Sequence, residues 1–153
     1  MGSQPSFPYT KGEVRRAGET IRAFLLAPPG VLLAGPDEIE AVAVTRAWRA
    51  VHQVPLTKAA MGLRSMVNTC GYEVEVSQRL KRLTTIFNKL VREPGMSLAR
   101  MQDLGGCRAV LPSIEAVYAV QRRAKNNGRV QRSRGDLNFW LLVLEHHLLD
   151  GCA

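Results

Sequence analysis

The chain has 153 residues, which suits one globular domain with its own core and leaves little room for a second. Its hydrophobic content of 46% argues against disorder, and 21 Lys and Arg against 13 Asp and Glu give a net charge of +8. That balance favours partners that carry phosphate, such as nucleotides or nucleic acid, although an acidic protein or a membrane surface would also suit it.

The sequence shows no sign of export or of a membrane span. Its start, MGSQPSFPY, lacks a basic segment followed by an apolar one, and its longest apolar run, 139–144, is far below the ~18–20 residues that a span needs. The cysteines are odd in number and lack zinc-binding spacing: Cys70, Cys107 and Cys152. We therefore expect a soluble, cytoplasmic protein with reduced thiols.

The amino-terminal part is expected to be helical. Thr10 and Glu13 form a capping-box pattern, and the apolar residues that follow recur at helical spacing, which predicts a helix over 11–26. Asp37 and Glu40 repeat the capping pattern and open a second helix.

A third helix is expected before the pattern changes. The second helix ends near Pro55, because proline disfavours helical backbone before it. Thr57 then caps a helix that runs to about Thr69 and stops at Gly71. The segment 1–70 is therefore expected to be mostly helical.

From Tyr72 onward the hydrophobic period becomes two. Three apolar residues fall on one parity: Val74, Val76 and Leu80. This predicts a half-buried strand with Arg79 and Lys81 on its polar face. A helix in which Glu75 and Arg79 pair four residues apart is the alternative.

An α/β pattern continues downstream. A short amphipathic helix is expected up to Pro94, with Lys89 and Arg92 outside its apolar stripe of Leu83, Ile86, Phe87 and Leu90. A second strand is expected over 106–111. Ser113 begins a further helix that carries apolar residues on one side: Ile114, Val117, Tyr118 and Val120. A turn at Asn127-Gly128 then leads into a strand over 129–132.

Asp103 stands just before two glycines and the second strand. A carboxylate there can approach a phosphate-bound Mg²⁺, because glycine lets a ligand come close and Mg²⁺ prefers oxygen ligands completed by substrate phosphates. The alternative is a simple Asx turn. Four cations accompany Asp103: Arg79, Lys81, Lys89 and Arg108. Guanidinium forks and mobile ammonium charges suit a triphosphate held against a metal.

The run RLKRLTTIFNKLVREPGMSLARMQDLGGCRAV resembles the start of the synthetase domain of the RelA/SpoT family, the alarmone synthetases that move pyrophosphate from ATP to the 3′ hydroxyl of GDP or GTP. The stretch AWRAVHQVPLTKAAMGLRSMV resembles the helical lead-in of small stand-alone and phage-borne members, some of them toxic. With VYAVQRRAKNNGRV, the similarity covers about 10–134. It implies a nucleotidyltransferase-like mixed sheet over 71–136, preceded by the helical segment. The apolar tail, 137–153, departs from the family, and we expect the chain to form one globular unit.

The resemblance also implies roles for single residues. Arg79 and Lys81 would contact the adenine and phosphates of ATP, and Lys89 would also reach the phosphates. Asp103 would bind Mg²⁺, with Arg108 supporting the phosphate site. The acceptor would be GDP or GTP or, as in toxic members, the 3′ end of tRNA, and an antitoxin or a second copy of the chain would be the protein partner.

The acceptor-side motifs of the family do not occur in the sequence. In the family, a Gly-Tyr-Arg motif supplies a tyrosine that stacks on the acceptor guanine, and a later strand bears the catalytic glutamate. Here residues 133–136 lead into LNFWLLVLEHHLLDGCA, whose Glu145 does not match that pattern, so no catalytic residue is assigned. Two functions stay open: a pyrophosphokinase, and an incomplete domain that binds nucleotide or RNA or regulates a full-length homologue. A plain RNA-binding fold ranks last because only 6% of the residues are aromatic.

Overall fold

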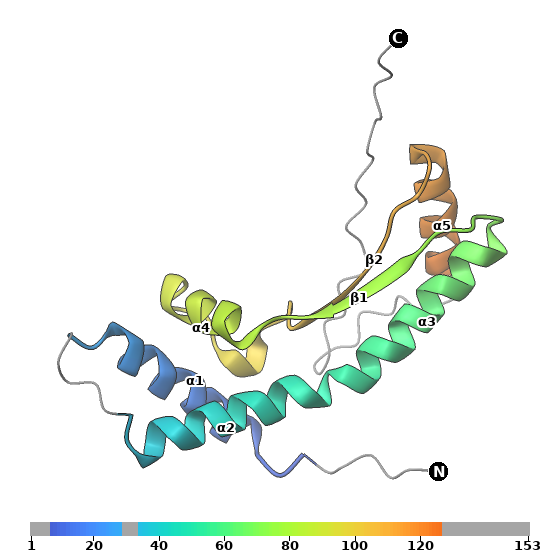
Figure 1. Ribbon diagram of the computed structural model, residues 1–153. Helices are drawn as coiled ribbons and strands as arrows, with labels where there is room; N and C mark the ends of the chain where they lie inside the picture. The colour runs from blue at the N-terminus through green and yellow to red at the C-terminus, as the bar shows by residue number, and fades with distance from the viewer. Residues whose placement is uncertain (1–6, 29–33, 127–153) are drawn as a thin grey trace. The chain divides into compact units, whose positions relative to one another are not determined.

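The computed structural model describes residues 7–28 and 34–126, which form an α+β protein with a two-stranded antiparallel sheet (Figure 1). The elements follow in the order α1 (Lys11–Leu26), α2 (Pro36–Val51), α3 (Gln53–Thr69), β1 (Val76–Leu80), α4 (Leu83–Arg92), the 3-10 helix η1 (Leu98–Arg100), β2 (Gly105–Ala109) and α5 (Ile114–Asn126). The general α+β class is confirmed, and the nucleotidyltransferase-like arrangement stays a prediction. The expected strand 129–132 and the tail 137–153 lie outside the described residues.

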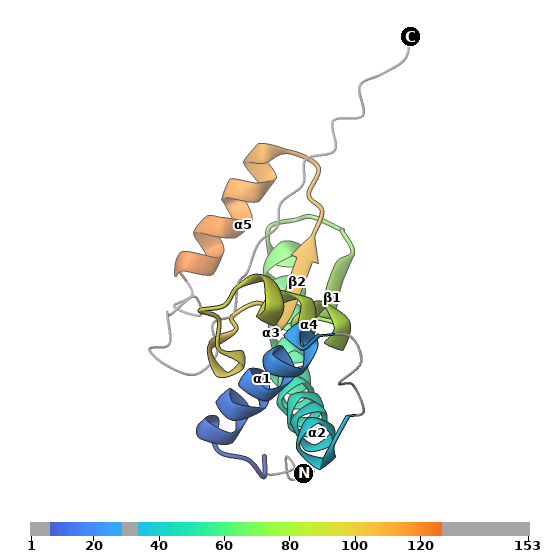
Figure 2. The same cartoon turned by 90° about the vertical axis from the view of Figure 1, so that its left-hand side faces the viewer.

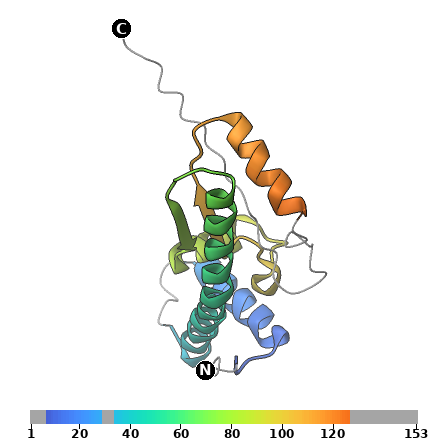
Figure 3. The same cartoon turned by 90° about the vertical axis from the view of Figure 1, so that its right-hand side faces the viewer.

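The chain forms two compact units, each drawn from two stretches of sequence. Of the described residues, unit 1 contains those up to 53 and 80–104, and unit 2 contains 54–79 and 105–126. In unit 1, α1 packs against α2, α4 and η1, and Figure 2 shows α1 lying along α2. In unit 2, α3 lies beside the paired strands (Figure 3), where Cys107 Sγ is 3.7 Å from the carbonyl oxygen of Leu56. Of the helices within the described ranges, none is both long and apolar enough to cross a bilayer.

Helix α1 follows the expected capping box. Glu13 N–H donates to Thr10 Oγ1 at 3.2 Å, and Thr10 N–H donates to Glu13 Oε2 at 2.6 Å, so two helix-end donors are satisfied. The helix runs from Lys11 to Leu26 as expected. Gly18 permits the close approach of η1, because a Cβ atom at this position would lie 2.8 Å from Leu98 Cβ.

Helix α2 begins one residue before the expected capping pair. Gly35 is the N-cap and Pro36 the first helical residue, a position where the missing N–H of proline costs no hydrogen bond. Glu38 Oε2 accepts the N–H of Gly35 at 2.8 Å. The predicted pairing of Asp37 with Glu40 is therefore wrong, because glycine has no side chain that would mark it as a cap.

Helix α3 is longer than expected at its start. It begins at Gln53, so Thr57 lies inside the helix and the prediction that it caps the helix is wrong. Pro55 falls in the first turn, where a backbone N–H has no intrahelical acceptor, and so it does not end a helix. The predicted end is confirmed: α3 stops at Thr69, and Gly71 has a φ of 84°, a left-handed conformation that glycine adopts without strain.

Strand β1 confirms that a strand forms here, and the alternative helix through Glu75 and Arg79 is wrong, but the strand begins at Val76 rather than Tyr72 and ends before Lys81. Its exposure does not alternate cleanly, because three consecutive residues are exposed: Ser77, Gln78 and Arg79. Within the described residues, β2 is its only neighbouring strand. Strand β2 begins one residue before the expected range 106–111 and ends two residues earlier, at Ala109.

The helix after β2 forms where expected but buries a partly different face. Helix α5 begins after Ser113, whose Oγ accepts the N–H of Ala116 at 3.2 Å. Its buried residues are Ala116, Val120 and Ala124, whereas Ile114 and Tyr118 are exposed. The predicted apolar side is therefore only partly right: Val120 is buried as expected, but two alanines, rather than Ile114 and Tyr118, complete the inward face.

The core of unit 1 positions the candidate site. Its buried residues come from α1, α2, α4, η1 and the segment that follows η1, namely Val14, Ala17, Ile21, Ala41, Val44, Ile86, Leu90, Leu98, Met101 and Leu104. Helix α4 confirms its prediction and contributes the two buried residues of its apolar stripe, Ile86 and Leu90. The last two core residues, Met101 and Leu104, flank Asp103.

Candidate functional site

Three of the five predicted site residues meet in unit 1. Lys81 Nζ donates to Asp103 Oδ2 at 2.6 Å, and Lys89 Nζ lies 3.0 Å from Asp103 Oδ1. Each carboxylate oxygen thus faces one ammonium group. We call Lys81, Lys89 and Asp103 the lysine–aspartate triad.

The main chain of Lys81 is held on both sides. Its N–H donates to the carbonyl oxygen of Leu104 at 2.8 Å, and its own carbonyl accepts from Arg49 Nε of α2 at 2.7 Å. Lys81 directly follows β1, and its side chain is only 19% exposed. The bonded backbone fixes the position from which the side chain of Lys81 extends to Asp103.

Lys89 is more covered than its place in the sequence indicates. It precedes Leu90 on α4 and follows Ile86 by three residues, and both of these neighbours are fully buried. Its side chain is 17% exposed, and its ammonium group lies on Asp103. The expectation that Lys89 lies outside the apolar stripe is therefore only partly right: the stem is covered while the charged end has a partner.

Asp103 lies in a turn between two core residues. Met101 and Leu104 are both buried, which anchors the turn on either side of the carboxylate. Both carboxylate oxygens face lysine ammonium groups rather than a neighbouring backbone N–H, which favours a charge role over the simple Asx turn.

The triad carries one surplus positive charge. Burial acts to raise the pKa of the Asp103 carboxyl, but the contacts and charges of Lys81 and Lys89 outweigh that effect and leave the pKa below its usual value. Two lysine side chains, each less than one-fifth exposed, therefore place their ammonium groups on one ionised carboxylate, whose own side chain is 41% exposed. Covered charge without a counter-charge is unfavourable, so this arrangement favours an anionic ligand.

The other two predicted site residues belong to the sheet of unit 2. Arg79 is an exposed residue of β1, and Arg108 is a half-buried residue of β2. Ser77 Oγ makes a long, 3.5 Å hydrogen bond to the carbonyl oxygen of Arg108, which places Ser77 opposite Arg108 in the antiparallel pair. Because residues two apart on a strand share a face, Arg79 and Arg108 are diagonal neighbours on one face of the sheet. We call them the arginine pair.

A metal ion at the triad would have few protein ligands. Within residues 7–28 and 34–126, no group of three or more His, Cys, Asp or Glu side chains is placed to hold an ion. Asp103 Oδ1 is buried and accepts no well-directed hydrogen bond among these residues, so its contact with Lys89 is an ion pair only. Mg²⁺ is often held by one or two carboxylates, water and substrate phosphates. Asp103 therefore fits a metal that arrives with phosphate rather than a resident ion.

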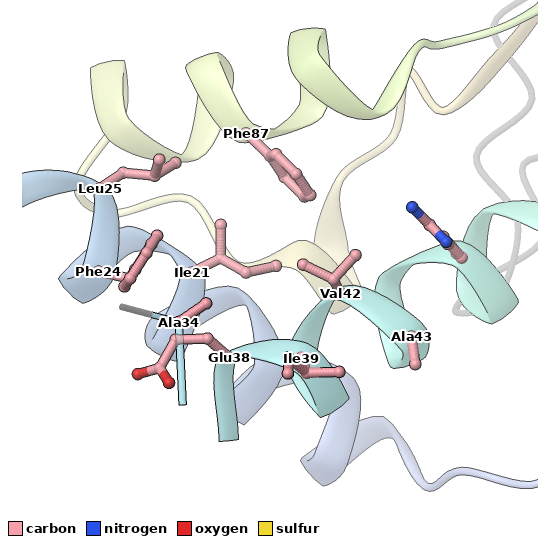
Figure 4. A pocket seen from close by; sticks show the side chains of 10 residues that line it. Ile21, Phe24, Leu25, Ala34, Glu38, Ile39, Val42, Ala43 and Phe87 are labelled. Carbon is pink, nitrogen blue, oxygen red and sulfur yellow. The ribbon is translucent and has the colours of Figure 1, made fainter. Parts of the chain in front are cut away.

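Unit 1 also has a cavity of about 520 Å³ between α1 and α2, which Phe87 of α4 also lines (Figure 4). Its lining is mostly apolar and contains none of the five predicted site residues. The lining residues are Ile21, Phe24, Leu25, Ala34, Glu38, Ile39, Val42, Ala43, Arg46 and Phe87. The carboxylate of Glu38 already accepts the N–H of Gly35. The cavity lacks the paired cations and carboxylate of the triad, and sequence patterns did not indicate it.

Two arginines that support the site were also missed by sequence reasoning. Arg49 holds the carbonyl of Lys81, as described above. Arg22 of α1 donates from Nε to the carbonyl oxygen of Leu90 at 2.7 Å, and it also donates to the carbonyl oxygen of Met96. Both arginines reach residues more than 30 positions away in sequence, so no local pattern indicates them.

No protein-family model matches the chain, and no curated protein matches it.

Proposed function

We propose that the chain binds ATP with Mg²⁺ at the lysine–aspartate triad and transfers pyrophosphate to the 3′ hydroxyl of a guanosine nucleotide. The observation that carries this proposal is the arrangement of Lys81 and Lys89 around the single carboxylate of Asp103, at 2.6 and 3.0 Å. The resemblance to the alarmone synthetases supports the choice of reaction. The net charge of +8 supports a phosphate-bearing substrate.

The chemistry matches what the triad has to offer. In the transfer, the 3′ oxygen of the acceptor bonds to the β-phosphorus of ATP, the bond from that phosphorus to the α,β-bridging oxygen breaks, and AMP leaves. Such a step depends mainly on positioning and on neutralising phosphate charge. Lys81 and Lys89 would bind phosphate oxygens, and Asp103 would hold Mg²⁺, which neutralises phosphate charge when bound.

The proton of the attacking hydroxyl needs an acceptor. No described residue is assigned as this proton acceptor, and in this scheme Asp103 binds the metal instead. Arg79 and Arg108 keep the nucleotide-binding roles that the resemblance implies, as predictions to be tested by substitution.

A second candidate function is nucleotide binding without transfer. The sequence lacks a match to the Gly-Tyr-Arg motif and to the catalytic glutamate of the family, which favours this alternative. Such a domain would bind ATP or RNA, or act on a full-length homologue. Transfer to the 3′ end of tRNA is a variant of the first candidate, which a high positive charge suits because a long phosphate backbone rewards many cations.

The test is AMP release from labelled ATP with Mg²⁺, in separate reactions with GDP, GTP and bulk tRNA. We expect AMP with one of these acceptors and loss of that activity in Asp103→Asn. The matched control is Asp37→Asn, which removes an exposed carboxylate at the start of α2 and should keep activity. Unchanged turnover in Asp103→Asn would remove the triad from the mechanism. ATP binding without AMP from any acceptor would select the second candidate.

A further inference from the structure

The cavity between α1 and α2 has the size and the lining of a small-molecule site. Its volume of about 520 Å³ falls in the range of ~300–1,000 Å³ that is usual for such sites, and its lining is mostly apolar. The lining residues come from α1, α2, α4 and the residue Ala34, and none of them belongs to the lysine–aspartate triad. A ligand in this cavity would therefore be separate from the nucleotide of the proposed function.

The walls of the cavity leave apolar side chains in contact with water. Figure 4 shows Phe87 of α4 pointing toward Ile21 of α1 and Val42 of α2. Ile21 is only 4% exposed and belongs to the core of unit 1. By contrast, Leu25 and Ile39, which also line the cavity, are 45% and 64% exposed. An apolar ligand would remove part of this surface from water, and such burial is favourable in proportion to its area.

Two charged residues line the cavity, and one of them is available to a ligand. Glu38 lies in the first turn of α2, where its carboxylate accepts the N–H of Gly35 at 2.8 Å and suits the positive end of the helix dipole. Arg46 lies about two turns further along α2, or about 12 Å along its axis. Arg46 is exposed, and within residues 7–28 and 34–126 it makes no hydrogen bond or ion pair. The cavity therefore offers a ligand one unpaired positive charge.

This arrangement defines the chemistry of a ligand. The planar guanidinium group of Arg46 matches a carboxylate through two parallel hydrogen bonds. A carboxylate carries the single charge that Arg46 can balance, whereas a phosphate monoester carries about 1.5 to 2 negative charges at neutral pH. The part of α2 that lines the cavity extends from Glu38 to Arg46, which suits an elongated ligand. We propose that the cavity binds a medium-chain alkyl carboxylate, with the carboxylate on Arg46 and the alkyl chain against the apolar walls.

The chain and the head group of the ligand test this proposal on the wild-type protein. Decanoate should bind saturably, and octanoate should bind more weakly, by up to about fourfold for each methylene that is removed. Decylammonium, which has the same chain and the opposite charge, should bind more weakly than decanoate. A surface that attracts anions through its charge alone would not distinguish octanoate from decanoate.

Reversal of the charge at Arg46 should reverse the preference between the two head groups. Arg46→Glu places a carboxylate at this end of the cavity, so decylammonium should bind more tightly than it does to the wild-type protein, and decanoate more weakly. The matched control is Arg16→Glu, which makes the same charge change at an exposed residue of α1 that does not line the cavity. This control should keep the wild-type order. A gain of decylammonium binding is not an effect that misfolding would produce.

A bulky side chain in the cavity should block the alkyl chain. Ala43 lines the cavity and is exposed on α2, so Ala43→Trp adds an indole ring there without replacing a core residue. This variant should lose decanoate binding. The matched control is Ala50→Trp, which makes the same change at an exposed residue of α2 outside the lining and should bind decanoate as the wild-type protein does.

The experiment measures binding of decanoate, octanoate and decylammonium by calorimetry, below the concentrations at which they form micelles, on the full chain and the four variants. Circular dichroism checks the folding of each protein, and sedimentation with vesicles of phosphatidylcholine and phosphatidylglycerol checks attachment to a bilayer.

Decanoate binding that depends on chain length, that Ala43→Trp abolishes and that Arg46→Glu exchanges for decylammonium binding supports the proposal. Decanoate binding that persists in folded Ala43→Trp, or a head-group order that Arg46→Glu and Arg16→Glu change alike, overturns it. Attachment to vesicles without saturable binding of free decanoate also overturns it, and assigns the exposed apolar residues to a membrane surface. None of these outcomes bears on ATP binding at the triad.

Discussion

The lysine–aspartate triad and the arginine pair are built differently. In unit 1, Lys81 and Lys89 are largely covered and paired with the carboxylate of Asp103. In unit 2, Arg79 is exposed on a strand, and it shares a sheet face with Arg108. The difference teaches that charge in the sequence does not by itself mark a site: the lysines are held by a core and a counter-charge, whereas Arg79 is carried on an open strand.

The largest expected effect follows from the dependence of the triad on the core of unit 1. Leu90→Ala removes a fully buried side chain next to Lys89, so we expect a loss of about 2–5 kcal/mol in the free energy of unfolding and weaker Mg–ATP binding. The control is Leu26→Ala, because Leu26 is 61% exposed at the end of α1. Urea denaturation measures both variants. Equal stability of the two would contradict the packing described for α4.

A smaller loss of stability is expected when the contact between Arg49 of α2 and the backbone of Lys81 is removed. Arg49→Met removes the charged donor to the carbonyl of Lys81, and we expect a loss of about 1.5–3 kcal/mol, together with a higher Kd for Mg–ATP. Arg46→Met changes an exposed arginine of the same helix and should have little effect on either quantity. If both variants bind Mg–ATP as the wild-type protein does, Arg49 does not position Lys81.

A substitution in the arginine pair should weaken nucleotide binding without changing the stability of the fold. Arg79→Gln alters an exposed strand residue, so the free energy of unfolding should stay within about 0.5 kcal/mol of wild type. If the role implied by the resemblance holds, the same variant weakens nucleotide binding. Calorimetry with Mg–ATP checks the second part, and unchanged affinity would confine the site to the triad.

The smallest effect is on stability in acid. Because the pKa of folded Asp103 lies below its ordinary value of 3.8, its pairing stabilises the protein above that pH, and the contribution is lost as the pH falls further through the folded pKa. The stability difference between the wild-type protein and Asp103→Asn should therefore be constant near neutral pH and shrink below pH 3.8. A difference that grows in acid would have the wrong sign for this pair.

The sequence predicts local features better than long-range ones. The capping box of Thr10 and Glu13 and the left-handed stop at Gly71 depend on neighbouring residues, and the structure confirms both. The inward face of α5 could not be read from size alone, because Ala116 and Ala124 pack inward while Tyr118 does not. Helical periodicity alone predicts that the larger apolar residues are buried, and only the packed structure shows which residues face inward.

The candidate site shows the same limit. The residue types and spacing of Lys81, Lys89 and Asp103 indicate a phosphate site, but not that the three side chains pair with one another. The support from Arg49 spans 32 positions and depends on how α2 packs within unit 1. Such a contact leaves no trace in hydrophobic period or capping pattern.

A crystal structure with Mn²⁺ and a non-hydrolysable ATP analogue, in which anomalous scattering locates the metal, would test nucleotide binding at the triad. We expect Mn²⁺ bound to a carboxylate oxygen of Asp103 and to the phosphates, with Lys81 and Lys89 moved from Asp103 onto phosphate oxygens. A nucleotide bound elsewhere, or bound while both lysines remain on Asp103, would contradict it.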